Sequence, residues 1–345
     1  MKCKTAIIHT DAVRREIAGN WVLAKELNKL GYEVSITSRI TTRRLVKLIY
    51  VDLLILSHPW TLPNSELKRL RNRGVKIFVA DVEGNLDSGN ILESTYNKNM
   101  DLSNFDGILV WNQWSKKWMI NNTTIDKDIL HVTGSVRTSI YRGITKSEKL
   151  ETIGFLCRFE FINIFDSRHN FSLLTKHHSQ SEWMRNFKLR RWKLDLDLFT
   201  KYLDAIEIAL KTGKKVSVRP HPNENVESYD ILNKYFNYKI EINKEPDYLD
   251  WLSNVDIIVG TISTANTEAY LSNKIIINLD NIVDSSYFEG YEEWGKVNKL
   301  CAHYPKNNNE LSNLLNFSNL QPVKSKDYQE YLNNYYDLKN GDALS

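Results

Sequence analysis

Short apolar runs of strand length recur along the chain, and most are followed by a stretch with helical spacing of apolar residues. The runs at 52–56 and 255–260 are almost continuously apolar, which is typical of strands buried on both faces of a parallel sheet. The first apolar run lies at 5–9. After it, apolar residues three and four apart between 14 and 30 indicate a helix. Strands that alternate with helices predict an α/β protein built on doubly wound parallel sheets.

Two series of such strands fit within 345 residues, a length that suggests about two domains. The first series is expected at 5–9, 33–37, 52–56, 75–79, 107–111 and 130–132, and the second at 152–157, 215–219, 239–242, 255–260 and 274–279. We expect two Rossmann-like domains, 1–145 and 146–325, that face each other across a cleft. A last helix within 326–345 is expected to pack back on the first domain.

The composition excludes several classes of protein. No apolar run approaches the ~20 residues of a membrane span, and the first residues lack the pattern of a signal peptide. The three cysteines lie far apart and indicate neither a disulfide framework nor a metal site. A net charge of +4 does not demand nucleic acid as a partner. These features predict a cytoplasmic protein.

The turn at 219–222 carries the sequence Arg-Pro-His-Pro directly after a β-branched run. Its two prolines cannot donate to a ladder, so the strand must end there and hold His221 rigidly. The carboxyl ends of parallel strands are where α/β sheets bind ligands, and a cation beside an imidazole suits a phosphate. We therefore predict a phosphate site at Arg219 and His221; the alternative is a turn whose histidine caps nearby carbonyls.

Two carboxylates, Asp81 and Glu83, follow the expected strand at 75–79, and Gly84 allows a tight turn after them. A carboxylate held there could act as a general base toward an acceptor hydroxyl. The pair could equally cap a helix or a loop. A metal site would need a third ligand, and none is visible in the sequence.

The strand at 255–260 runs into a Ser/Thr cluster where a helix should begin. Free backbone N–H groups, the Ser263 and Thr264 hydroxyls and the helix dipole would together form an anion site. Glu268, about one turn further on, could reach a ribose hydroxyl. The alternative is a capping motif, which is compatible with phosphate binding.

Three further patterns are open to more than one interpretation. The basic, aromatic segment 158–193 could hold an anionic acceptor, dock at lipid head groups, or be an ordinary solvated loop and helix. Asp195 and Asp197 form a DxD pair, which we assign to the start of a helix at 194–211 rather than to a metal. His58, followed by Pro59 and Trp60, is interpreted as a turn histidine rather than part of a cleft.

Together these residues resemble the inverting GT-B glycosyltransferases of bacterial surface-carbohydrate synthesis, which build capsule and lipopolysaccharide. Arg-Pro-His-Pro on a strand end, then a strand into Ser-Thr-x-x-x-Glu-Ala, is similar to their nucleotide-binding half. Kdo transferases, His-Pro-motif sialyltransferases and CDP-glycerol glycerophosphotransferases share this pattern. In the first half, 14–16, 81–84 and 132–137 look like family landmarks. The chain departs from the pattern at Ser135-Val136, where many relatives have Asn-Pro, and in the longer segment 158–193.

The resemblance implies roles for individual residues. Glu83 would be the general base with Asp81 in support, His221 and Arg219 would meet the donor phosphate with Ser263 and Thr264, and Glu268 would hold the ribose or cytosine.

The implied reaction is a metal-independent transfer from a cytidine-activated sugar such as CMP-Kdo, with the nucleotide sugar as substrate and no cofactor. The acceptor would be a glycan or glycolipid, and segment 158–193 would provide peripheral contact with the inner membrane face. Three further functions stay open: a CDP-alditol phosphotransferase of the teichoic-acid type, a nucleotide-sugar epimerase of the same fold, and a non-catalytic binding partner in a polysaccharide assembly complex.

Overall fold

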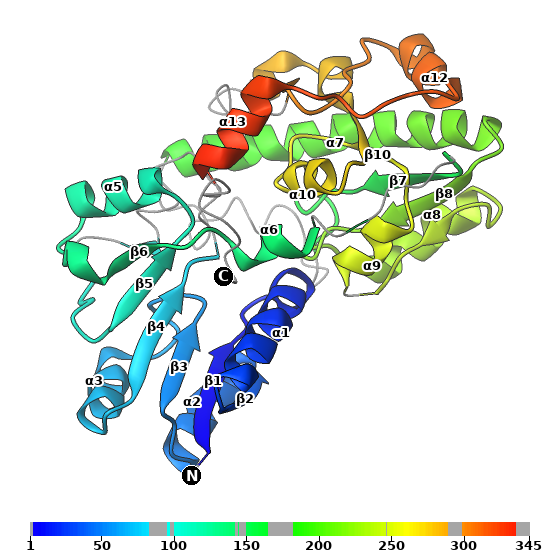
Figure 1. Ribbon diagram of the computed structural model, residues 1–345. Helices are drawn as coiled ribbons and strands as arrows, with labels where there is room; N and C mark the ends of the chain where they lie inside the picture. The colour runs from blue at the N-terminus through cyan, green and yellow to red at the C-terminus, as the bar shows by residue number, and fades with distance from the viewer. Residues whose placement is uncertain are drawn as a thin grey trace. The chain divides into compact units, whose positions relative to one another are not determined.

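The computed structural model of the protein describes residues 3–82, 95, 96, 100–141, 144, 150–164, 182–245, 247–288 and 299–335. The chain divides into two compact units, one of residues 1–143 with 329–345 and one of residues 144–328. Within the described residues each unit has its own parallel sheet (Figure 1). The predicted α/β class with two parallel sheets is therefore confirmed.

The first unit is built on a six-stranded sheet with the order β2-β1-β3-β4-β5-β6, in which every pairing is parallel. Its strands are β1 (Lys4–His9), β2 (Tyr32–Thr37), β3 (Leu53–Leu56), β4 (Lys76–Ala80), β5 (Gly107–Val110) and β6 (Leu130–Val132). The described helices are α1 (Val13–Lys29), α2 (Arg39–Leu48), α3 (Asn64–Asn72), α5 (Gln113–Asn122) and α6 (Val136–Tyr141). Because β1 lies between β2 and β3, the direction of winding reverses beside β1.

The second unit is built on a five-stranded parallel sheet with the order β11-β10-β7-β8-β9. Its strands are β7 (Thr152–Leu156), β8 (Lys215–Arg219), β9 (Glu241–Ile242), β10 (Ile257–Gly260) and β11 (Ile275–Asn278). The described helices are α7 (Glu182–Lys211), α8 (Tyr229–Tyr235), α9 (Tyr248–Ser253), α10 (Ala265–Leu271) and α12 (Asn308–Asn316). A last helix, α13 (Lys326–Tyr335), begins in the second unit, and its residues from 329 on belong to the first unit. The start of α13 is held against α10 by a 3.0 Å hydrogen bond between the Tyr328 and Thr267 hydroxyls.

The strands form where the sequence offers continuous apolar runs. Every residue of β3, β10 and β11 is buried, as expected for strands covered on both faces. In β7, Gly154 leaves room for the Trp251 ring, whose Cζ2 would lie 2.7 Å from an added Cβ. Trp251 is fixed there because its indole N–H donates to the Ser217 hydroxyl at 2.9 Å.

One predicted boundary is wrong. We expected a helix from 194, with Asp195 at its start, but α7 begins at Glu182. Asp195 therefore lies in the interior of the helix, where the dipole of a helix start cannot explain it. Its actual contacts belong to the candidate site described next.

Candidate functional site

The second sheet reverses its winding between β7 and β10. The chain passes from β7 outward to β8 and β9, and returns on the other side of β7 with β10. Ligands of α/β sheets bind outside the carboxyl ends of the strands at such a switch point. Here Arg158, just after β7, donates to the Ile262 carbonyl, just after β10, at 2.7 Å. This bond directly joins the loops that follow the two strands.

His221 lies at the end of β8, as the sequence predicted for the Arg-Pro-His-Pro turn. Its Nδ1 accepts a hydrogen bond from the backbone N–H of Asn223 at 3.2 Å and lies 3.7 Å from Glu160 Oε2. Asn223 also donates its side-chain amide to Glu160 at 3.0 Å. Because Nδ1 accepts, the neutral imidazole carries its proton on Nε2. The ring is about one-third exposed.

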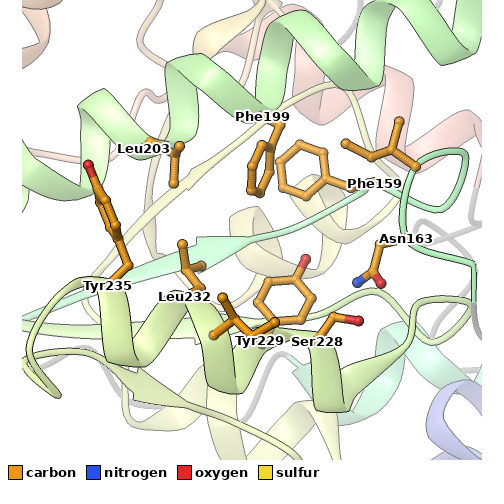
Figure 2. A pocket seen from close by; sticks show the side chains of 10 residues that line it. Phe159, Asn163, Phe199, Leu203, Ser228, Tyr229, Leu232 and Tyr235 are labelled. Atoms are coloured by element: carbon orange, nitrogen blue, oxygen red, sulfur yellow. The ribbon is translucent and has the colours of Figure 1, made fainter.

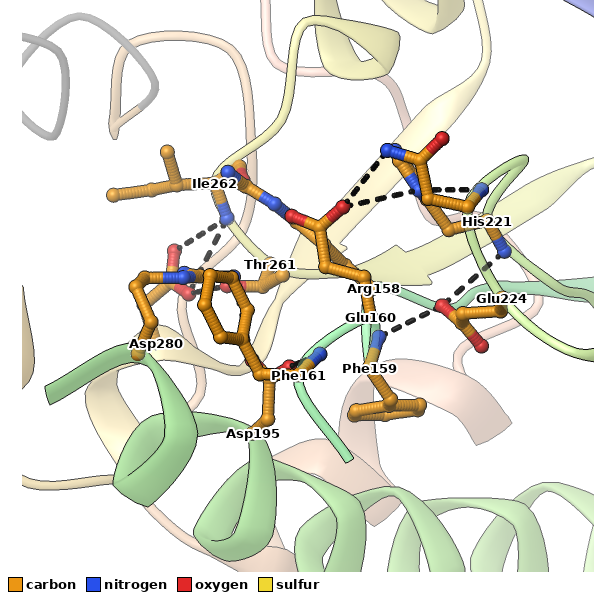
Figure 3. A network of polar contacts seen from close by, with 12 residues as sticks. Arg158, Phe159, Glu160, Phe161, Asp195, His221, Glu224, Thr261, Ile262 and Asp280 are labelled. Carbon is orange, nitrogen blue, oxygen red and sulfur yellow. Dashed lines mark hydrogen bonds and ion pairs between the residues drawn. The ribbon is translucent and has the colours of Figure 1, made fainter. Parts of the chain in front are cut away.

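Glu160 is the acidic neighbour of that histidine. Burial opposes its charge, but His221, Arg158 and the bond from Asn223 together hold the pKa of Glu160 below its ordinary value. The site therefore keeps a carboxylate beside the imidazole at neutral pH. Figure 3 shows Glu160 between Arg158 and His221.

Glu224 anchors the turn after β8 and is fully buried. It accepts from the backbone N–H groups of Phe159 at 2.7 Å and His221 at 3.3 Å, and from the Tyr229 hydroxyl. Burial raises the pKa of Glu224 to about 7, although these donors oppose the shift. One carboxyl group thus fastens the loop after β7 to the turn after β8.

Asp195 performs a similar function from α7. It accepts from the Phe161 N–H at 3.0 Å and pairs with Arg191, one turn earlier, at 3.3 Å. Burial raises the pKa of Asp195 to about 7, against the effect of Arg191. Our assignment of Asp195 to a helix start is corrected: it is a buried cap of the loop after β7.

Asp280 fastens the third loop. It follows β11 and accepts from the Thr261 hydroxyl and from the Ile262 N–H at 3.1 Å (Figure 3). Burial raises the pKa of Asp280 to about 6 in spite of these bonds. Three buried carboxyl groups therefore hold the loops that carry the rim of the site: Glu224 from within the turn after β8, and Asp195 and Asp280 from other elements.

Arg219, the second residue of the predicted phosphate site, is held by contacts within the second unit. It is buried, and its guanidinium donates to the Asn243 side chain and to the Glu245 carbonyl at 3.1 Å. The guanidinium also lies over the rings of Tyr248 and Trp251. These contacts hold the segment between β9 and α9, so contact of Arg219 with a phosphate stays a prediction.

The Ser/Thr cluster lies at the start of α10, after β10. The Ser263 hydroxyl accepts from the Ala265 N–H at 3.2 Å, so the capping interpretation describes this contact. Thr264 occupies the N-cap position and makes no side-chain capping bond there. Both side chains are half-buried, whereas Glu268 is buried within the helix. Their roles toward a nucleotide stay predictions.

The predicted catalytic turn of the first unit is described only in part. Asp81 follows β4 and is buried; its carbonyl accepts from the Trp111 indole N–H at 2.6 Å, and its own N–H donates to Leu109. Glu83 and Gly84 lie outside the described residues. Residues 165–181, in the middle of the basic segment, also lie outside them.

A cavity of about 440 Å³ lies next to the polar network in the second unit. It opens between α7 and α8 and is lined by Phe159, Ile162, Asn163, Phe199, Leu203, Ser228, Tyr229, Ile231, Leu232 and Tyr235 (Figure 2). None of these side chains is charged, so this cavity is not suited to a phosphate. Within the described part of the chain, no three His, Cys, Asp or Glu residues form a group that could hold a metal ion.

Sequence reasoning missed the residues that build this network. Glu224 stands three residues after His221, yet its partner Phe159 is 65 residues away in the sequence. The other carboxyl caps likewise bond to loops far from them in the chain. The one local signal is the spacing of Arg191 and Asp195, four apart on a helix and of opposite charge.

No family model matches the chain, and no curated protein matches it. Among solved structures, the wall teichoic acid polymerase TagF aligns with a TM-score of 0.56 at 12% identity, over 100% of this chain and 87% of that one. A TagF structure soaked with CDPG aligns at 0.55 and 10% identity, over 99% and 86% of the two chains. The UDP-GlcNAc 2-epimerase of Methanocaldococcus jannaschii aligns at 0.54 and 12% identity, over 99% and 96%.

At these identities the likeness shows the fold. The α/β architecture with two parallel sheets is that of the GT-B class, as the sequence predicted. No helix in the described ranges is both long and apolar enough to cross a membrane.

Proposed function

We propose that the protein is an inverting, metal-independent glycosyltransferase of bacterial surface polysaccharide synthesis, and that its donor is a cytidine-activated sugar of the CMP-Kdo kind. One observation carries the proposal. His221 is held at the carboxyl end of β8 with Nδ1 accepting from Asn223, which places the proton of the neutral ring on Nε2, the atom that would donate to a phosphate oxygen. Arg158, in the loop after β7 at the switch point of the sheet, adds a positive charge that could pair with the phosphate.

In the proposed reaction, Glu83 takes the proton of the acceptor hydroxyl, with Asp81 in support. The acceptor oxygen attacks the anomeric carbon, and the bond from that carbon to the phosphate oxygen breaks. CMP leaves with the electron pair. His221, Ser263 and Thr264 stabilise the departing charge, an effect that contributes roughly 2.7–4 kcal/mol per donor in comparable sites.

Nucleotide affinity is the first test. Calorimetric titration with CMP, CDP and UDP should show a preference for cytidine nucleotides. Replacing His221 with Ala should weaken CMP binding by about 10-fold or more, because a hydrogen bond to a charged group contributes roughly 1.5–3 kcal/mol. His131→Ala is the matched control, since His131 is exposed on β6 of the other unit. A preference for UDP, or equal CMP affinity in His221→Ala, would refute the donor assignment.

A second candidate function is phosphotransfer from a CDP-alditol. The likeness to TagF, including the structure soaked with CDPG, is the observation that favours it. Here the acceptor oxygen would attack phosphorus instead of carbon, CMP would again leave, and the product would contain phosphorus. Phosphorus analysis of the product therefore separates the two transferases.

Glu83→Gln separates both transferases from an epimerase and from a non-catalytic binding protein. A general base typically contributes 10²- to 10⁴-fold to rate, so transfer should fall by about that factor while CMP binding persists. An epimerase, the class to which the M. jannaschii UDP-GlcNAc 2-epimerase belongs, would convert a nucleotide sugar without any acceptor. Product formed in the absence of acceptor would contradict our proposal.

A further inference from the structure

A second polar cluster lies in the first unit, at the carboxyl ends of β1 and β3. The six-stranded sheet reverses its winding between these two strands, so this is the switch point of the first unit. His9 is the last residue of β1, and Ser57 directly follows β3. The Ser57 backbone N–H donates to His9 Nδ1 at 3.4 Å, and the Ser57 hydroxyl lies 2.9 Å from the His9 carbonyl.

His9 is almost completely buried, with 1% of the residue exposed. Its Nε2 atom has no hydrogen-bond partner within the described residues. Because Nδ1 accepts from Ser57, the neutral ring carries its proton on Nε2. Burial lowers the pKa of His9 to about 4, so the ring is neutral at pH 7. A buried N–H donor requires an acceptor, and an oxygen atom of a ligand would supply one.

Two carboxylates, those of Glu16 and Asp11, act on the His9 ring, and they differ in their burial. Glu16 is buried and accepts from the N–H groups of Asp11 and Ala12, each at 3.1 Å, and from the Ser57 hydroxyl at 2.8 Å. Its oxygens therefore hold the loop after β1. Asp11 is about one-third exposed and, of the charged groups around His9, acts on the ring most strongly.

The other titratable or charged groups that act on His9 are His58 and Arg39. His58 Nε2 lies 3.6 Å from Asp11 Oδ2, and the His58 ring stacks on Trp60 with centroids 4.5 Å apart. The Arg39 guanidinium lies 4.4 Å over the same Trp60 ring. The stack holds His58 against Asp11, and so fixes the carboxylate beside His9. Our interpretation of His58 as a turn histidine omitted this contact.

We propose that the carboxyl ends of β1 and β3 form a binding site for a hydroxyl group of a polyol or saccharide. His9 Nε2–H donates to the hydroxyl oxygen, and the Asp11 carboxylate accepts the hydroxyl hydrogen. A hydroxyl fits because it is both acceptor and donor, whereas a phosphate would meet the like charges of Asp11 and Glu16. His9 is not a general base here, because its Nε2 already carries the proton.

If the transferase proposal holds, this hydroxyl belongs to the acceptor. The site itself depends on the first unit alone and is therefore tested separately from nucleotide binding. CMP binding without a response at His9 would refute this site and leave the donor proposal intact. A response at His9 without nucleotide binding would support this site and refute the donor proposal.

The test is nitrogen-15 spectroscopy of the histidine rings in the full chain, which has eight histidines. The probes are glycerol, methyl glucoside and methyl galactoside. We expect a neutral His9 ring protonated at Nε2, and a saturable shift of its signals and of the Ser57 amide with at least one probe. The exposed His131 should not shift. Absence of a saturable shift with all three probes would refute the proposal.

Two variants give the matched comparison, followed at the Ser57 amide. His9→Asn keeps an oxygen near Nδ1 for the Ser57 N–H but lacks the Nε2–H donor, so affinity should fall about 3- to 10-fold. His9→Gln keeps an N–H near the Nε2 position and should retain more of the affinity. Asp11→Asn, at a partly exposed position, should weaken binding without unfolding the unit. Equal affinity in all three variants and the native protein would overturn the assignment.

Discussion

Replacing Glu224 with Gln should change how the stability of the protein depends on pH. Glu224 is fully buried, and burial raises its pKa from an ordinary value of 4.5 to about 7. Between these two values the folded state keeps a proton that the unfolded state releases. The free energy of unfolding therefore falls as pH rises through this window. At 1.36 kcal/mol per pH unit, the total loss is on the order of 3 kcal/mol.

The glutamine variant should lack this loss. Its side-chain oxygen can still accept from the N–H of Phe159, and its amide can donate to the Tyr229 hydroxyl, so the turn keeps its bonds. Urea unfolding of both proteins at pH 4.5 and pH 8 measures the effect. The buried Asp195 and Asp280, whose pKa values are also raised, are present in both proteins and cancel in the difference.

The difference in unfolding free energy between Glu224→Gln and the native protein should thus grow by about 3 kcal/mol from pH 4.5 to pH 8. Glu227→Gln is the matched control: Glu227 is exposed three residues further on, and the variant should follow the native profile. An equal difference at the two pH values would show that Glu224 does not hold a proton in the folded state, and would refute the reasoning.

Two further substitutions test the packing of the second unit. Gly154→Ala places a Cβ 2.7 Å from the Trp251 ring and should cost about 1–3 kcal/mol in chemical unfolding; Gly260→Ala, whose Cβ would lie 3.6 Å from its nearest neighbour, is the control and should cost less. Equal losses would contradict the close approach of the ring. Tyr328→Phe removes the hydroxyl bonded to Thr267 and should cost about 1–3 kcal/mol, measured in the same way. No loss would mean that this bond does not help to hold the start of α13.

Much of the fold could be predicted because its signals are local. The apolar run that became β10 is bounded by polar residues, and its burial on both faces follows from the run itself. The end of α1 could be predicted from Gly31, which adopts a φ of +85° that other residues rarely take.

The start of α7 could not be predicted because segment 182–193 is basic and aromatic rather than amphipathic. Its Arg, Lys and Leu residues are nevertheless good helix formers, and Arg191 gains a partner in Asp195 only because the helix continues. The polar network could not be predicted for another reason. Asp195 bonds to Phe161 and Asp280 to Ile262, at separations of 34 and 18 residues that only the folded sheet brings together.

The carboxyl groups that hold the three rim loops have a consequence for affinity. A loop that orders only when its ligand arrives reduces binding by the entropy it loses at that moment. Here Glu224, Asp195 and Asp280 order the loops when the chain folds. A substitution that removes these bonds at any of the three, such as one to Ala, should therefore weaken the binding of a ligand that never touches the residue. Its effect would show as greater motion of the unbound rim rather than as a missing contact.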